Sequence, residues 1–203
     1  MNGRVPRSPA EELALAVVAL RRGEVVAYPT ETFYGLAVDP FDELALARLR
    51  ELKGRGDKGI SLLVVGVGVL ERVCAPPSAK ARALMERYWP GALTLALPAR
   101  PDVPEALVIE GCVAVRESSH PLARALVRAF GGPLTTTSAN LAGQRPATTP
   151  AEVEAALGGR CAVLPGGATP GGAPSTLARV RGTRIEVLRA GAVTIAPEFL
   201  ADE

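Results

Sequence analysis

The sequence predicts an α/β (α+β) fold in which a twisted mixed sheet is flanked by helices. Along the 203 residues, segments with helical spacing of apolar residues alternate with short β-like segments, and no internal repeat is found. Apolar residues make up 48% of the chain, which suffices for one substantial core. We therefore expect a single compact domain over residues 1–203.

Five helices are predicted, and several are framed by capping signals. Ser8 with Glu11, and Thr149 with Glu152, form capping boxes around a proline at the first helical position. Asp42 is suited to cap the second helix, and a glycine follows its end. The predicted helices cover residues 9–22, 43–53, 79–88, 121–130 and 150–157.

Eight short segments, mostly rich in Val, Ile, Leu and Thr, are typical of strands. They cover residues 25–28, 60–65, 92–97, 113–116, 134–137, 162–164, 177–180 and 185–188. The segment 165–174 contains four glycines and three prolines. Because glycine permits large backbone changes, we expect a mobile lid over a site; a plain linker is the alternative.

Charge and hydropathy argue against two classes of function. The chain has 23 Lys and Arg against 21 Asp and Glu, and its net charge of +2 is too small to support bulk nucleic-acid binding through phosphate contacts. The apolar run at residues 13–20 is far shorter than a membrane span. No membrane contact is therefore expected.

The cysteines and the single histidine argue against metal and nucleophile chemistry. Cys74, Cys112 and Cys161 are far apart and form no C-x-x-C pair, which is typical of reduced, buried thiols in a cytoplasmic protein. His120 begins a predicted helix, where we expect it to cap or pack rather than act as an acid or base. We therefore expect neither a zinc site nor a catalytic cysteine.

A basic loop follows the second predicted helix. Lys53 ends that helix, and Arg55 and Lys58 follow within KGRGDKG. The loop contains G-x-G-x-x-G, but a helix precedes it and a β-rich run follows, which is the reverse of a dinucleotide-binding loop. Phosphates would therefore be held by side-chain cations and not by a helix N-terminus. A solvated charged loop is the alternative.

Polar side chains gather where predicted strands end. Thr30 and Thr32 follow the first strand in PTET, and the strand at 134–137 is followed by Ser138 and Asn140. Arg116 ends another strand, where a guanidinium can clamp a carboxylate, although a structural ion pair is an alternative. Cations for phosphates, hydroxyls for a small polar molecule and an arginine for a carboxylate together predict a site for ATP and an amino acid.

Seven segments of the chain carry a resemblance to one family. YPTETFYGL, KGR followed by DKG, YWPGALTLAL, VAVRESSHP, TTTSANLAG, PST and VLRAGAV resemble, in this order, the YrdC-like threonylcarbamoyl-AMP synthases. The resemblance implies a large positively charged cavity within the twisted sheet. It also implies that L-threonine, bicarbonate and ATP, with Mg²⁺, give threonylcarbamoyl-adenylate and pyrophosphate. The product would pass to a tRNA threonylcarbamoyl transferase complex, and a weak tRNA contact is compatible with this role.

The resemblance also implies residue roles. Threonine would contact Thr32, Arg116, Thr136 and Ser175, whereas ATP would contact Lys53, Arg55, Lys58, Ser138, Asn140 and Arg189, with Lys53 and Arg55 also catalytic. No residue is implied as a metal ligand. The chain departs from the family at Gly56, where proline is common, and at Ala142, which replaces a hydroxyl. We expect the short, single-domain form, without the additional C-terminal domain of longer members.

A binding module for double-stranded RNA or tRNA, without catalysis, is the alternative function. Proteins with this fold were once regarded as binders of double-stranded RNA. RNA binding alone, however, leaves the hydroxyl-rich strand ends unexplained and predicts a more basic surface than a net charge of +2 supplies.

Overall fold

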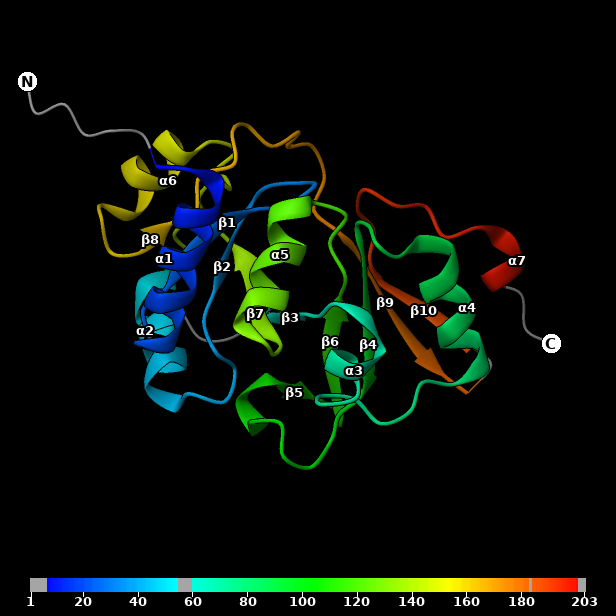
Figure 1. Cartoon of the computed structure of the whole chain (residues 1–203). Helices are drawn as coiled ribbons and strands as arrows, with labels where there is room; N and C mark the ends of the chain where they lie inside the picture. Colours follow the sequence, from blue (N-terminus) through cyan, green and yellow to red (C-terminus); the bar gives the residue numbers. More distant parts are fainter. Residues whose placement is uncertain (1–6, 55–59, 183, 201–203) are drawn as a thin grey trace, which may run out of the picture.

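The computed structural model describes residues 7–54, 60–182 and 184–200. Within them, ten strands form one twisted sheet with helices packed around it (Figure 1). The strands are β1 (Val26–Pro29), β2 (Tyr34–Ala37), β3 (Ser61–Leu63), β4 (Leu93–Pro98), β5 (Val108–Ile109), β6 (Cys112–Arg116), β7 (Leu134–Ser138), β8 (Ala162–Val163), β9 (Thr176–Arg181) and β10 (Arg184–Arg189).

The sheet is mixed, as the sequence predicts. Its strand order is β10-β9-β4-β6-β3-β7-β2-β1-β8, and β5 pairs with β6 at the side of this path. The pairs β1/β8, β3/β6 and β4/β9 are parallel, and the other pairs are antiparallel. Strands that are distant in sequence therefore lie side by side.

The five predicted helices are confirmed with closely matching ranges, because their ends are set locally, and two further short helices, α3 and α7, match no predicted range. The helices are α1 (Pro9–Arg21), α2 (Glu43–Lys53), α3 (Gly66–Leu70), α4 (Ala79–Tyr88), α5 (Pro121–Phe130), α6 (Pro150–Leu157) and α7 (Pro197–Leu200), with a short 3-10 turn at Glu105–Leu107. The box of Ser8 and Glu11 is formed. The second box is formed in part: the Thr149 side chain accepts from the Glu152 amide, and the Glu152 carboxylate accepts from the Thr148 amide.

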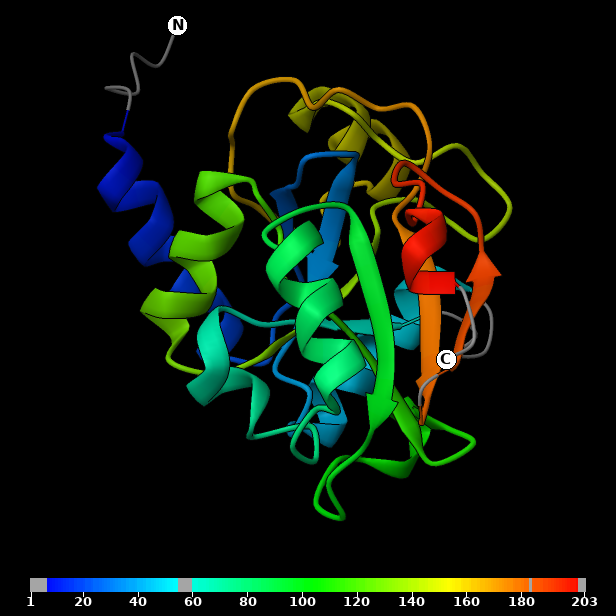
Figure 2. The same ribbon diagram turned by 90° about the vertical axis from the view of Figure 1, so that its right-hand side faces the viewer.

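Apolar side chains form two buried clusters. The smaller one joins α1 and α5, which pack against each other, to β1 (Figure 2). The larger one lies under α2, α4 and α6 and contains the inward residues of most central strands. His120 caps α5 by accepting a 3.2 Å hydrogen bond from the Leu122 amide at Nδ1, which confirms its capping role.

Two differences from the predicted elements have clear causes. The strand β2 was not predicted, because Gly35 interrupts its β-pattern; yet a Cβ at Gly35 would lie only 3.0 Å from the Tyr28 ring, so glycine is what lets β2 pair with β1. The strand predicted at 60–65 is shorter than expected. Val65 leaves the sheet to become the N-cap residue of α3.

The three cysteines are free, as expected for reduced thiols. Cys74 is buried as predicted, whereas Cys112 and Cys161 are only half-buried. In the described part of the chain, no helix is both long enough and apolar enough to span a membrane.

Candidate active site

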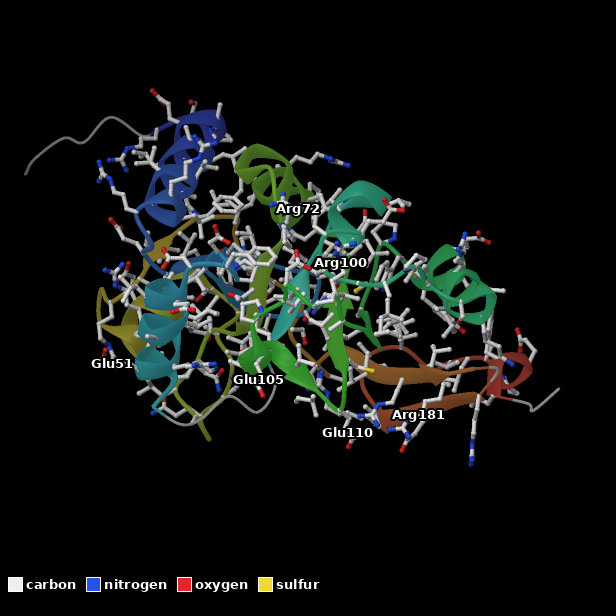
Figure 3. The ribbon with its side chains drawn as sticks, turned by 90° about the horizontal axis from the view of Figure 1, so that it is seen from below. Glu51, Arg72, Arg100, Glu105, Glu110 and Arg181 are labelled. Atoms are coloured by element: carbon white, nitrogen blue, oxygen red, sulfur yellow. The ribbon has the colours of Figure 1, made fainter. Side chains whose placement is uncertain are left out.

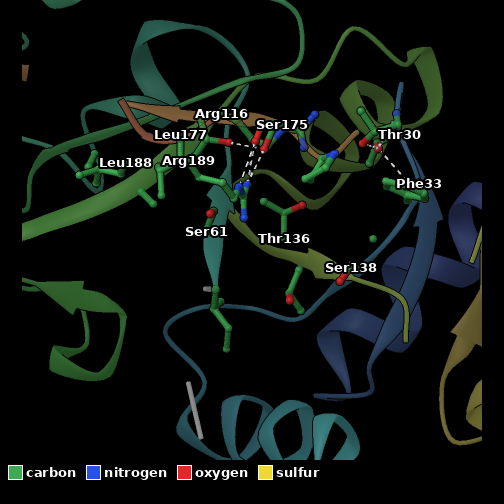
Figure 4. Close-up of a pocket in the computed structure, with 18 of the residues that line it drawn as sticks. Thr30, Phe33, Ser61, Arg116, Thr136, Ser138, Ser175, Leu177, Leu188 and Arg189 are labelled. Carbon is green, nitrogen blue, oxygen red and sulfur yellow. Dashed lines mark hydrogen bonds between the residues drawn. The ribbon is translucent and has the colours of Figure 1, made fainter. Parts of the chain in front are cut away.

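A cavity of about 470 Å³ opens on one face of the sheet (Figure 4). Its floor has room because small residues face it: Ala96 of β4 pairs with Ala114 of β6, and both line the cavity. In the described part of the chain, five basic side chains and no acidic one line it, which favours a positive potential. Those five are Arg50, Lys53, Arg116, Arg179 and Arg189.

The fold brings most of the predicted site residues to this cavity. Lining it are Thr32, Lys53, Arg116, Thr136, Ser138, Ser175 and Arg189. Asn140 contacts two of them directly. Arg55 and Lys58 lie outside the described residues, as does the rest of the loop between α2 and β3.

Lys53 is the last residue of α2, and its side chain contacts the end of β7 and the residues that follow it. Its Nζ donates to the Ser138 carbonyl oxygen at 2.6 Å and to Asn140 Oδ1 at 2.9 Å. Ser138 Oγ donates to the same Asn140 oxygen at 2.5 Å. Burial lowers the pKa of Lys53 to about 8. Three of the residues predicted to contact ATP therefore form one cluster.

A pH dependence follows from this buried lysine. The ammonium carries its charge below about pH 8 and loses it as the pH rises through that value. If ATP is a substrate, as the sequence predicts, kcat/KM for ATP should fall on the alkaline side, because only the charged form attracts phosphates, at an apparent pKa near that of the free protein. In Lys53→Arg, whose guanidinium stays charged, the fall should move to higher pH. An identical profile in both proteins would contradict this assignment.

Arg116, at the end of β6, is paired with a residue that sequence reasoning missed. Its Nη2 donates to Glu31 Oε1, and Ser118 Oγ donates to the other oxygen of that carboxylate. The Arg116 and Glu31 side chains are 8% and 16% exposed. Burial, and then the like charge of Arg189, lower the pKa of Arg116 to about 10, which still leaves the guanidinium charged at neutral pH.

Arg116 also lines the cavity, where its guanidinium is expected to meet a ligand carboxylate. Its Nε is buried and has no hydrogen-bond partner. Since Nε and Nη2 share one edge of the guanidinium, a ligand carboxylate that takes Nε would lie next to Glu31. Of the two alternatives that the sequence left open, the structural ion pair is therefore confirmed, and the carboxylate clamp stays a prediction.

Hydroxyl groups form the wall next to this arginine. The Tyr28 hydroxyl, fully buried, donates to Thr136 Oγ1 at 2.6 Å. Burial raises the pKa of Tyr28 to about 12, so its hydroxyl stays neutral and can donate. Thr136 therefore accepts from Tyr28 and has its own proton available for a ligand. The Thr30 and Thr32 hydroxyls lie 3.2 Å apart at the same wall.

Ser175 and Arg189 also line the cavity, together with Thr94, a residue that sequence reasoning missed. The hydroxyls of Ser175 and Thr94 lie 2.8 Å apart. Arg189 Nη2 donates to the Ser175 carbonyl oxygen at 2.8 Å and to its Oγ at 3.2 Å. Tyr28 and Glu31 lie within YPTETFYGL, and Thr94 lies within YWPGALTLAL. Their hydrogen-bond partners are too distant in sequence for a sequence pattern to reveal these contacts.

The segment 165–174, predicted to be a lid, is hydrogen-bonded to the site in this structure. The Tyr34 hydroxyl donates to the Gly167 carbonyl oxygen at 2.8 Å, and the Gly171 amide donates to that of Thr32 at 2.6 Å. Thr169 is buried and its amide donates to Thr148. Opening of segment 165–174 would have to break these hydrogen bonds. Its glycine content alone does not establish such a movement, so the lid stays a prediction.

Hydrogen exchange tests whether this segment responds to ligand. If it closes over the cavity, saturating ATP and threonine should slow exchange at the amides of Gly171, Gly172 and Ala173, because closure limits local opening. The amides of Leu126 and Val127 in the core of α5 serve as the reference that should not change. Equal protection of residues 165–174 with and without ligands would refute the lid.

No group of three or more His, Cys, Asp or Glu that could hold a metal ion occurs among the described residues.

Comparison with known proteins identifies the family. The sequence matches the Sua5/YciO/YrdC family model, described as "Telomere recombination", over residues 18–191. The threonylcarbamoyl-AMP synthase of Bacillus subtilis is 40% identical over 187 residues, which cover 90% of this chain and 54% of that protein. The synthase of Chromohalobacter salexigens is 44% identical over 176 residues, covering 83% of this chain and 92% of that protein.

Solved structures agree with the sequence comparison. The crystal structure of P. abyssi Sua5 complexed with L-threonine matches with a TM-score of 0.85 and 32% identity, over 92% of this chain and 55% of that chain. The present chain thus spans about half the length of the B. subtilis and P. abyssi proteins. Fold and cavity define an α/β protein whose ligand site combines hydroxyl and basic side chains. The chain belongs to the Sua5/YciO/YrdC family.

Proposed function

We propose that this protein is a threonylcarbamoyl-AMP synthase, which makes threonylcarbamoyl-adenylate and pyrophosphate from L-threonine, bicarbonate and ATP. The observation that carries the proposal is the meeting of basic and hydroxyl side chains in one cavity. The names of the relatives, and the threonine complex of P. abyssi Sua5, support it.

The threonine half of the site is built around Arg116. Its guanidinium would bind the α-carboxylate, and the hydroxyls of Thr32, Thr136 and Ser175 would face the polar groups of the amino acid. The unprotonated amino group and bicarbonate would give a carbamate with loss of water. The three hydroxyls lie in the same cavity as Arg116, so they can hold the carbamate in place for the second step.

The ATP half is built around Lys53 and Arg189, with Ser138 and Asn140 fixing the lysine. A carbamate oxygen would attack the α-phosphate, forming a new P–O bond while the bond to pyrophosphate breaks. Negative charge then moves to the leaving group, and cations already in place stabilise it. Arg55 and Lys58 would add to this charge. Mg²⁺ would enter the site bound to the phosphates of ATP, because proteins usually bind this ion together with substrate phosphates.

The product defines the next step. A mixed anhydride of a carbamate and AMP is an activated acyl donor, so a transferase that modifies tRNA to threonylcarbamoyladenosine would consume it. A weak contact of this protein with tRNA would serve the transfer and belongs to the same proposal.

Mass spectrometry tests the proposed reaction. The protein is incubated with ATP, Mg²⁺, threonine and ¹³C-bicarbonate, and the adenylate should carry the label only when all components are present. Release of pyrophosphate should follow the same requirement. Labelled adenylate that stays absent, while the protein is folded and binds threonine, would overturn the proposed reaction.

Threonine should bind better than valine, its isostere without a hydroxyl. A site built to hydrogen-bond a hydroxyl leaves its own polar groups unpaired when the ligand lacks one, which costs about 1 to 3 kcal/mol. Titration calorimetry with both amino acids measures the difference. Equal affinities would contradict the assignment of Thr32, Thr136 and Ser175.

A further inference from the structure

The hydroxyl group of Tyr28 is enclosed within the fold, away from water. Side chains at the outside of the molecule, such as Glu51 and Arg181, can satisfy their polar atoms with water (Figure 3). Tyr28, on β1, is 0% exposed and does not line the cavity. Its hydroxyl therefore depends on a protein partner, and that partner is Thr136 Oγ1 of β7, at 2.6 Å.

The direction of this hydrogen bond follows from burial, since either hydroxyl is able to donate. If Thr136 donated, the Tyr28 proton would need a second acceptor, and the hydrogen bonds within residues 7–54, 60–182 and 184–200 include none for it. A buried donor without a partner is costly, whereas Thr136 lines the cavity, where a ligand or water can take its proton. Tyr28 is therefore the donor, and the Thr136 proton is left for the cavity.

Gly35 makes this contact possible. Tyr28 pairs with Gly35 of β2, and β7 lies on the other side of β2. A Cβ at Gly35 would lie 3.0 Å from Cζ and 3.1 Å from the hydroxyl oxygen of Tyr28. Because glycine has no side chain, the tyrosine can extend across β2 to β7. The sheet then holds the hydroxyl in a fixed place beside Thr136.

The hydrogen bond from Tyr28 changes what Thr136 offers to a ligand. A hydroxyl that accepts a hydrogen bond becomes a better donor, because hydrogen bonds in a chain polarise one another. Arg116 is close enough to act on this pair: burial raises the pKa of Tyr28 to about 12, while the Thr136 hydrogen bond and the charge of Arg116 oppose the rise. Thr136 and Arg116 both line the cavity (Figure 4). Two donors in one cavity suit the acceptor oxygens of an amino acid.

We propose that Tyr28 is a positioning residue for the amino-acid substrate: it holds the Thr136 hydroxyl as a directed donor toward an acceptor oxygen of that substrate. Tyr28 itself does not touch the ligand and acts through Thr136. This inference rests on the proposed function, because it assumes that an amino acid binds beside Arg116.

Calorimetry with L-threonine on a double-mutant cycle tests this role. Tyr28→Phe removes only the hydroxyl, and it should weaken threonine binding about fivefold, as the loss of one directed hydrogen bond does. Thr136→Val, which keeps the branched shape without a hydroxyl, should weaken it about tenfold. The double variant should bind threonine no more weakly than Thr136→Val alone, because Tyr28 then has nothing left to position.

Two further variants separate positioning from packing. Thr136→Ser keeps the hydroxyl, so Tyr28→Phe should again weaken threonine about fivefold in that background. Tyr88→Phe is the matched control, because it also removes a tyrosine hydroxyl from one hydrogen bond. Tyr88 ends α4, accepts a 2.8 Å hydrogen bond from the Ala196 amide and does not line the cavity, so this variant should bind threonine as the native protein does. Urea denaturation establishes that each variant is folded.

The outcomes distinguish the role of Tyr28 from the proposed function. A loss of affinity from Tyr28→Phe in the native and Thr136→Ser backgrounds, and not in the Thr136→Val background, supports the positioning role. If Tyr28→Phe binds threonine as the native protein does, or weakens it equally in the Thr136→Val background, the positioning role is wrong and the synthase function stands. If the native protein binds no threonine, the amino-acid site itself is wrong and both proposals fall.

Discussion

Replacing Lys53 with alanine should lower the rate of adenylate formation by about 10² to 10³-fold, as the loss of a preorganised charge at a transition state does. Lys53 is fixed by the Ser138 carbonyl oxygen and by Asn140, so its ammonium is held in place before the reaction. Threonine affinity should change little, since Arg116 and the hydroxyl wall lie elsewhere in the cavity. A comparable loss is expected for Arg55→Ala, in the loop outside the described residues.

The measurement is pyrophosphate release under saturating threonine and bicarbonate, with threonine affinity from calorimetry. Arg128→Ala serves as the control, because it removes a cation from the exposed face of α5 and is not among the cavity residues. Lys53→Arg should recover part of the rate. A folded Lys53→Ala protein with native activity would remove this lysine from the mechanism.

Replacing Arg116 with alanine should destabilise the protein by about 3 kcal/mol, because a largely buried carboxylate is left without its counter-ion. That carboxylate is Glu31, whose side chain is 16% exposed. Threonine binding should be lost at the same time, since the Arg116 guanidinium is the group proposed to bind its carboxylate. Urea denaturation and calorimetry measure the two effects separately.

The double variant Arg116→Met with Glu31→Gln separates stability from binding. It removes both charges, and a buried pair replaced in this way is often neutral for stability. We therefore expect stability close to that of the native protein and no recovery of threonine binding. If the double variant bound threonine normally, the carboxylate would be held by another group. If Arg116→Ala kept native stability, the ion pair with Glu31 would matter less than its burial indicates.

The sequence by itself determined the five longer helices and most strands, because their signals are local, but not the short helices α3 and α7. Ser8 with Glu11 and Asp42 mark helix starts through contacts a few residues away, and the structure forms both caps. It also determined the order of α2, the basic loop and β3, and so excluded a dinucleotide-binding loop. The second capping box is confirmed in part: Thr149 caps the Glu152 amide, but the Glu152 carboxylate accepts from the amide and hydroxyl of Thr148.

Only the tertiary structure decided which side chains meet. Arg116 and Glu31 are 85 residues apart, and Tyr28 and Thr136 are 108 residues apart. Each pair meets because the sheet order places the strands and turns that carry these residues close together, and strand order depends on packing between distant segments, which periodicity in sequence does not encode. Arg179 is a cavity residue for the same reason. It pairs in parallel register with Ala96 of β4, and both residues line the cavity.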